Sequence, residues 1–120
     1  MKTRYIISRY SGTKKEIKFN VRVARLIARK VLDDGYIPIV PHIYFTQFLD
    51  DNNHYEHNKG TEIALDLLKL SDSAVVVMID GGISDGMRAE MKCVSELGMP
   101  VKIMRLSKSG IKKLLRKSGV

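Results

Sequence analysis

The run SAVVVMI, residues 73–79, constrains the fold of this chain more than any other stretch. Its residues are almost all apolar, and they do not alternate with polar residues as they would in a strand with one wet face. A continuous apolar strand of this kind is expected at the centre of a parallel sheet, where both of its faces are buried.

Strand and helix patterns alternate along the rest of the chain. Further strands are expected at residues 4–8, 36–40 and 101–106, and helices at 14–34, at 60–72, up to about 97 and at 107–119. This alternation predicts one α/β domain over residues 1–120, a doubly wound (flavodoxin/Rossmann-like) parallel sheet with helices on both faces. Right-handed crossovers leave few topologies, and about four strands in the order 2-1-3-4 fit best.

Two local features refine this prediction. Pro38 lies inside the second expected strand and cannot donate a ladder hydrogen bond, so that strand is expected at an edge of the sheet. Residues 41–60 show no clear periodicity, apart from a short helical turn expected around FTQFL. We therefore expect a long irregular segment there, followed by a helix with Thr61 as its N-cap.

Ligands of such folds bind outside the carboxyl ends of the strands, here at the switch point between strands 1 and 3. The loops at that point are SRYSG and DGGISDGM. Glycines let the backbone approach a ligand, and the helix after the second loop offers free N–H groups to an anion. A plain turn in which Ser84 or Asp85 caps that helix is the simpler interpretation. The candidate ligand-binding residues are Ser8, Arg9, Tyr10, Asp80, Ser84, Gly86 and Met87.

Three side chains near these loops have functional and structural interpretations that both remain open. Arg9 is suited to a phosphate or carboxylate, or is one more surface arginine. Tyr10 is suited to stacking on a base, or covers the edge of the core. Glu90 borders the apolar face of its helix and is expected beside the cleft, although the helix dipole alone also favours an acid there.

Composition narrows the classes of partner. The net charge is +8, with ten basic residues in 1–30 and seven in 99–120. A basic excess attracts polyanions, but the chain has no tryptophan and no zinc-finger spacing, so nucleic-acid binding is an alternative that we do not favour. No apolar stretch approaches the roughly 18 residues of a membrane span, and no membrane partner is expected.

Cysteine and histidine usage predicts a cytoplasmic protein without metal or cofactor. Cys93 is the only cysteine, which excludes an internal disulfide and indicates a reducing compartment. His42, His54 and His57 lie near acids, but without the firm spacing of metal ligands.

Taken together, the residues resemble the nucleoside 2-deoxyribosyltransferase-like superfamily, and most closely its small, uncharacterised bacterial and phage branch. The matching segments are YIISRYSG with Asn20, GYIPIVPHIYF, LLKLSDSAVVV and ISDGMRAEMKCVSELGMPV. The resemblance implies a nucleoside or nucleotide ligand and a homo-oligomer. It also implies N-glycosidic bond cleavage or deoxyribosyl transfer, with Glu90 as the catalytic nucleophile that attacks the anomeric carbon.

The chain departs from the superfamily pattern at one position. Its enzymes usually carry an aspartate eight residues before the acid that opens strand 3, and counting back from Asp72 gives Ala64. That aspartate helps to protonate the leaving base, a contribution of about 10²–10⁴ in rate. Its absence favours the alternative of a non-catalytic binder of a nucleotide or a nucleotide-derived small molecule, whereas the retained Glu90 favours the enzyme.

Overall fold

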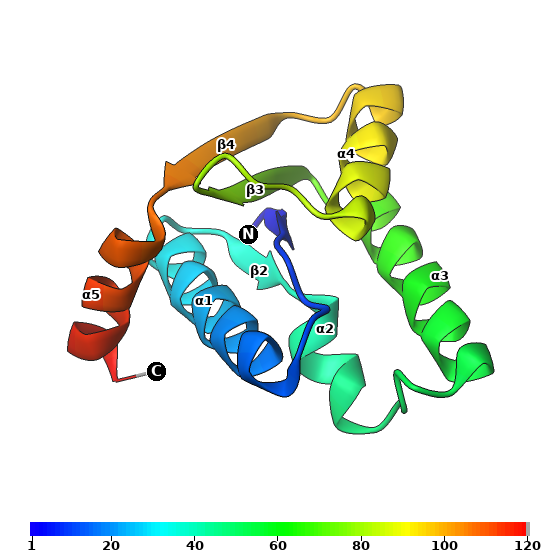
Figure 1. Cartoon of the computed structure of the whole chain (residues 1–120). Coiled ribbons are helices and arrows are strands. Elements are labelled where there is room, and N and C mark those ends of the chain that lie inside the picture. Colours follow the sequence, from blue (N-terminus) through cyan, green and yellow to red (C-terminus); the bar gives the residue numbers. More distant parts are fainter. Residues whose placement is uncertain (120) are drawn as a thin grey trace.

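Strands and helices alternate through residues 1–119, the part of the chain that the computed structural model describes (Figure 1). A short 3₁₀ helix, η1, lies between the second and third α-helices. The elements are β1 (Thr3–Ile7), α1 (Lys14–Asp33), β2 (Ile37–Ile39), α2 (Pro41–Tyr44), η1 (Phe45–Gln47), α3 (His54–Leu70), β3 (Ser73–Ile79), α4 (Asp85–Leu97), β4 (Val101–Leu106) and α5 (Lys108–Ser118).

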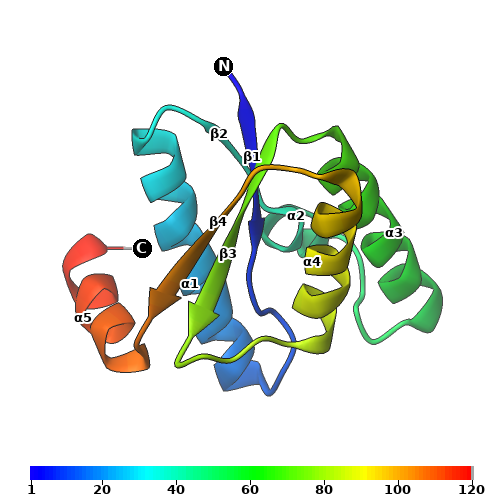
Figure 2. The same ribbon diagram turned by 90° about the horizontal axis from the view of Figure 1, so that it is seen from above.

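The four strands form one parallel sheet in the order β2-β1-β3-β4 (Figure 2). Tyr5 in β1 lies between Ile39 of β2 and Ala74 of β3. The fold class and the strand order predicted from the sequence are therefore confirmed. β2 is an edge strand, so Pro38 sits where a missing N–H donor is tolerated.

Helices cover both faces of the sheet and divide the core into two layers. On one face α1 and α5 pack over β1 and β3; on the other face α3 and α4 do so. Neighbouring residues of β3 belong to different layers, because Val75 faces α1 while Val76 faces α4, and both are 1% exposed. Burial of both faces explains why the strand is apolar without alternation.

Local capping interactions fix where the helices begin and end, and therefore where the loops at the carboxyl edge of the sheet lie. Thr13 and Glu16 form a reciprocal capping box at the start of α1. Ser84 accepts a hydrogen bond from the backbone of Met87 and caps α4, which decides between the two caps considered for this helix. Gly98 ends α4 in the left-handed region, with φ of 62°, where glycine is favoured.

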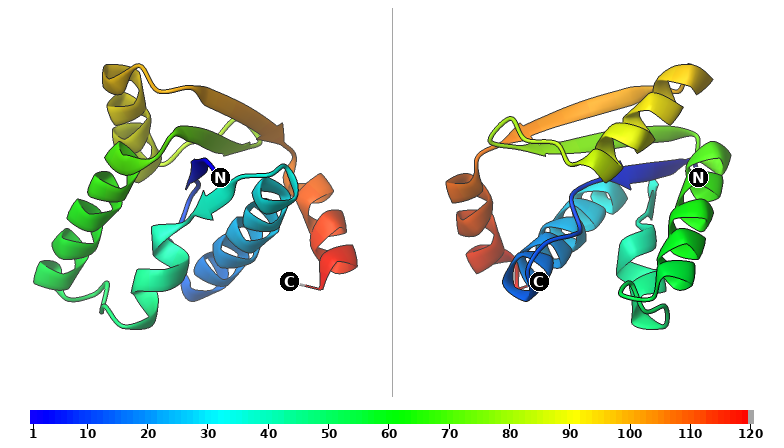
Figure 3. Two further views of the ribbon diagram at one scale, coloured as in Figure 1. Left: turned by 180° about the vertical axis from the view of Figure 1, so that it is seen from behind. Right: turned by 45° about the vertical axis from the view of Figure 1, so that its right-hand side comes forward.

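The prediction of a long irregular segment over residues 41–60 is wrong, although the helical turn expected around FTQFL is present as η1. α2 and η1 occupy its first part, and α3 begins at His54, so Thr61 lies inside this helix. The N-cap is Asn53, whose side chain accepts a hydrogen bond from the backbone N–H of Glu56. The first turns of α3 extend beyond α4 (Figure 3), and most of their side chains are exposed. They therefore carry no apolar stripe that periodicity could detect.

Candidate functional site

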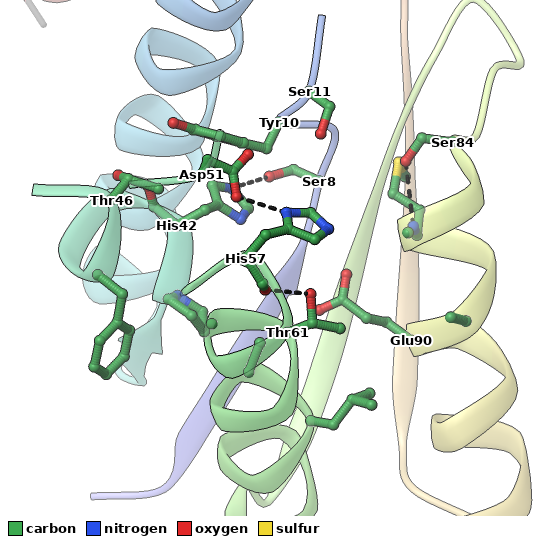
Figure 4. Close-up of a pocket in the computed structure, with 18 of the residues that line it drawn as sticks. Ser8, Tyr10, Ser11, His42, Thr46, Asp51, His57, Thr61, Ser84 and Glu90 are labelled. Atoms are coloured by element: carbon green, nitrogen blue, oxygen red, sulfur yellow. Dashed lines mark hydrogen bonds and ion pairs between the residues drawn. The ribbon is translucent and has the colours of Figure 1, made fainter. Parts of the chain in front are cut away.

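A cavity of about 550 Å³ lies at the carboxyl end of β1. Its walls come from β1 and the loop after it, from α2 and η1, from the first turns of α3, and from the start of α4 (Figure 4). We call this cavity the pocket. Its volume lies within the range of about 300–1,000 Å³ that is usual for small-molecule sites.

Glu90 projects into the pocket from the second turn of α4, and its side chain is partly buried. The hydroxyl of Tyr5 donates a hydrogen bond to Glu90 Oε2. Burial raises the pKa of the Glu90 carboxyl to about 7, and the hydrogen bond from Tyr5 lowers it in part. Glu90 therefore exists as a mixture of the protonated and ionised forms at neutral pH.

Tyr5 is held in the core of the sheet and is 1% exposed. Burial, and next the charge of Glu90, raise the pKa of its phenol above the usual range, so the phenol stays protonated and donates. Because β1 is an inner strand, Tyr5 cannot move without disturbing the layer beneath α3 and α4. The donor to Glu90 is thus a rigid part of the fold.

His42, Ser8 and Tyr10 form a second group on the pocket wall. Ser8 Oγ and His42 Nε2 are 3.1 Å apart, and the rings of Tyr10 and His42 have their centroids 5.4 Å apart at a tilt of 40°. Burial lowers the pKa of His42 to about 4, so this imidazole is neutral at pH 7. Asn20, which is 5% exposed, fixes the same loop by donating to the carbonyl of Tyr10 over 2.9 Å.

Asp51 and His57 form a third group on the pocket wall. His57 Nδ1 and Asp51 Oδ1 are 2.7 Å apart, and roughly half of each side chain is exposed (48% and 44%). His57 lies in the first turns of α3, and Asp51 lies in the loop that leads into it. In Figure 4 the imidazole lies between Asp51 and Glu90, with Thr61 one turn further along α3.

The structure brings most of the predicted site residues together. The pocket is lined by Ser8, Tyr10, Ser84, Gly86, Met87 and Glu90. Two of the predicted residues point elsewhere. The guanidinium of Arg9 lies against Gly82, and the carboxylate of Asp80 accepts a hydrogen bond from the backbone N–H of Lys108 at the start of α5, over 3.3 Å.

Sequence reasoning did not assign Tyr5, Asp51 and His57 to the site. Tyr5 has the pattern of an ordinary strand residue, and nothing local reveals that its hydroxyl meets Glu90. A signal for His57 does exist, because Asn53 followed three residues later by Glu56 is the pattern of a helix start. Applied to this segment, it would have placed His57 on a helix that borders the cleft.

Within residues 1–119, no group of three or more histidine, cysteine, aspartate or glutamate side chains is arranged to hold a metal ion. Across the same residues, no helix is both long enough and apolar enough to cross a membrane.

The fold and the pocket define a doubly wound α/β protein with a candidate ligand site at its topological switch point. The family described as "Domain of unknown function (DUF7768)" matches residues 2–104, and the chain belongs to this family. No curated protein matches the chain.

One of the similar solved structures is a 2-deoxyribosyltransferase from the psychrotolerant bacterium Bacillus psychrosaccharolyticus. The TM-score is 0.66, with 97% of this chain and 81% of that chain covered and 17% identity. That enzyme is described as a suitable biocatalyst for the industrial synthesis of antiviral and antitumoral nucleosides. At this identity the likeness establishes a shared fold.

Proposed function

We propose that this protein acts on a nucleoside or nucleotide and cleaves or transfers its N-glycosidic bond, with Glu90 as the nucleophile. The observation that carries the proposal is Glu90 itself, a partly buried carboxyl at the pocket wall with a fixed hydrogen-bond donor, Tyr5. The fold shared with a 2-deoxyribosyltransferase and the sequence resemblance support the same interpretation. We infer that the family is a small branch of that superfamily, whose members are nucleoside deoxyribosyltransferases or nucleotide N-glycosidases.

The chemistry needs a carboxylate that is charged, positioned and shielded from water. An oxygen of Glu90 would attack the anomeric carbon, and the sugar would remain on the enzyme as a glycosyl ester until water or a second base accepts it. The hydrogen bond from Tyr5 orients one oxygen and leaves the other for the attack. Since the pKa of Glu90 is about 7, the fraction of the protein that carries the reactive carboxylate should rise with pH between about pH 6 and pH 8.

A second candidate function is non-catalytic binding of a nucleotide or a nucleotide-derived small molecule in the same pocket. The observation that favours it is Ala64, which lines the pocket where the resemblance implies an acid for the leaving base. A protonated Glu90 would then serve as a hydrogen-bond donor to the ligand rather than as a nucleophile.

The test is incubation of the protein with ribo- and deoxyribonucleosides and their 5′-monophosphates, alone and with a second free base. Released or exchanged base is measured by chromatography. We expect turnover by the wild type and its loss in Glu90→Gln. The matched control is Glu96→Gln, because Glu96 is an exposed acid of the same helix, and it should keep wild-type turnover.

Three outcomes separate the candidates. Turnover that depends on Glu90 supports the enzyme. Base release by Glu90→Gln at the wild-type rate contradicts the nucleophile. If no substrate is turned over while a nucleotide raises the melting temperature, the binding function is supported instead.

The proposal also concerns the cellular location and the oligomeric state of the protein. We propose a cytoplasmic location, from the single cysteine, Cys93. We also propose a homo-oligomer, and the exposed apolar side chains at the edge of the sheet are consistent with a contact surface. They are Leu97 at the end of α4 and Val101 and Ile103 of β4, exposed by 49%, 49% and 39%.

A further inference from the structure

We propose that His57, held by Asp51, donates the proton to the departing base and takes the part of the acid that position 64 lacks. This inference rests on the proposed function and adds to it a catalytic residue, His57, and a positioning residue, Asp51. It is carried by the geometry of the first turns of α3 and the loop before them.

The contact between Asp51 and His57 fixes where the ring protons lie. A carboxylate accepts hydrogen bonds and does not donate them, so His57 Nδ1 carries a hydrogen toward Asp51 Oδ1, 2.7 Å away. The other ring nitrogen, Nε2, is then turned toward the interior of the pocket, on the side of Glu90 (Figure 4). An imidazole held in this way by a carboxylate is the arrangement of a proton donor or acceptor in catalysis.

Stability of the helix does not account for the placement of His57. A histidine that gains a proton in the first turns of a helix meets the positive end of the helix dipole, which is unfavourable. Asp51 offsets this effect, but a half-exposed pair contributes little to folding, about 0–1 kcal/mol. Orientation of the ring in the pocket is the stronger explanation for the pair.

His57 and Ala64 lie on the same side of α3. His57, Thr61 and Ala64 follow one another at spacings of four and three residues, and all three line the pocket. The two ends of this row are seven residues apart, about 10 Å along the helix axis. Ala64, Glu90 and His57 line the same pocket, and the small side chain of Ala64 leaves space in its wall. A base that fills this space would present to His57 a ring nitrogen that is not bonded to the sugar.

The proposed step is a displacement at the anomeric carbon. A Glu90 carboxylate oxygen forms a bond to the anomeric carbon while the bond from that carbon to the base nitrogen breaks, and the electron pair stays on the base. His57, protonated on both ring nitrogens, gives the proton on Nε2 to another nitrogen of the base, which leaves as a neutral molecule. Neutral His57 keeps the hydrogen on Nδ1, which still donates a hydrogen bond to Asp51. In the second half Nε2 takes a proton from the water or the incoming base that displaces Glu90.

Other titratable groups of the pocket are less suited to this role. His42 is neutral and engaged with Ser8, and the Glu56 carboxylate accepts a hydrogen bond from the backbone of Asp50 over 3.3 Å. The titratable groups that line the pocket around His57 are Tyr5, Tyr10, His42, Asp51, Glu56, Asp85 and Glu90. In contrast to these groups, His57 has a carboxylate partner on one ring nitrogen and a second ring nitrogen that is directed into the pocket.

The test compares two leaving groups with the whole 120-residue chain. One substrate is the natural nucleoside that the wild type turns over best, and the other is the 4-nitrophenyl glycoside of the same sugar, whose leaving group departs without a proton. We expect His57→Ala to lose about 100- to 10,000-fold in kcat/KM on the nucleoside. On the nitrophenyl glycoside it should stay within about threefold of the wild type. Glu90→Gln should be inactive on both.

Further variants separate catalysis from structure. His54→Ala is the matched control, because His54 is an exposed histidine of the same turn that does not line the pocket, and both of its rates should stay at wild type. Asp51→Asn should retain partial activity on the nucleoside. Its rate on the nitrophenyl glycoside should stay at the wild-type value, because Asp51 acts only through His57 and that leaving group needs no proton.

The two proposals fail in different ways. Equal losses on both substrates in His57→Ala, or no loss on the nucleoside, would overturn the role of His57 and leave the role of Glu90 intact. Full activity of Glu90→Gln, or a wild type that turns over neither substrate, would overturn the proposed function and this inference with it. Circular dichroism and melting temperature of each variant exclude loss of folding as the cause.

Discussion

Replacement of Glu90 by glutamine should make the protein more stable in a manner that depends on pH. In the folded chain the pKa of Glu90 is about 7, and in the unfolded chain it is near the ordinary value of 4.5. Between these two values the folded state keeps a proton that the unfolded state has lost, so the stability of the wild type falls as pH rises. Glutamine fills the same space without a charge, so the stability of Glu90→Gln should not fall with pH for this reason.

The size of the effect follows from the two pKa values. Each pKa unit corresponds to about 1.4 kcal/mol. The burial of the Glu90 charge therefore costs the wild type about 3 kcal/mol at pH 8, where most of the carboxyl is ionised, and about 1 kcal/mol at pH 5. The free energy of unfolding of Glu90→Gln relative to wild type should thus rise by about 2 kcal/mol from pH 5 to pH 8. A change in packing is the same at both pH values and cancels, and the effect of the bond to Tyr5 on ionisation is already contained in the pKa of Glu90.

Urea unfolding of both proteins at pH 5, 6, 7 and 8 measures this difference. Glu96→Gln is the control, because 67% of the Glu96 side chain is exposed, and its effect should change by less than about 0.5 kcal/mol over the same range. A difference between Glu90→Gln and wild type that is constant with pH would contradict the raised pKa of Glu90. The Glu90 carboxyl would then be as well solvated in the folded chain as in the unfolded one.

Two further predictions test the contacts that build the pocket. Tyr5→Phe removes the hydroxyl that favours ionised Glu90, so the pKa of Glu90 should rise above 7 in a ¹³C NMR titration of its carboxyl carbon; a lower pKa would contradict the assigned contact. Asn20→Ala removes the donor to the Tyr10 carbonyl and should cost about 1–3 kcal/mol in urea unfolding, with faster amide exchange in residues 8–12; protection equal to wild type would show that this bond does not hold the loop.

Much of the fold could be predicted from the sequence, because the features that specify it are local. The apolar run over 73–79 indicates that both faces of that strand are buried, and Pro38 indicates that its strand is at an edge. The start of α3 was predicted wrongly for a physical reason as well. Its first turns are exposed, so the evidence for the helix is the capping pair of Asn53 and Glu56 rather than a repeat of apolar residues.

The candidate site could be predicted only in outline. The topology rule predicts a ligand site at the two loops of the switch point, and six of the eight candidate residues line one pocket. Arg9 and Asp80 lie in the same loops but point away from it, because the direction of a loop side chain depends on turns that the sequence pattern does not encode. Asp80, for example, has φ of 50° and interacts with the start of α5.

Local features of the sequence specify the order of strands and helices, the central and edge strands, and an acid, Glu90, after the loop that follows β3. What surrounds that acid depends on how the elements pack. Tyr5 and Glu90 are 85 residues apart in the chain, and their contact exists because β1 and α4 pack in one layer. The raised pKa of Glu90 has the same origin, since its burial is produced by segments that meet only when the chain folds.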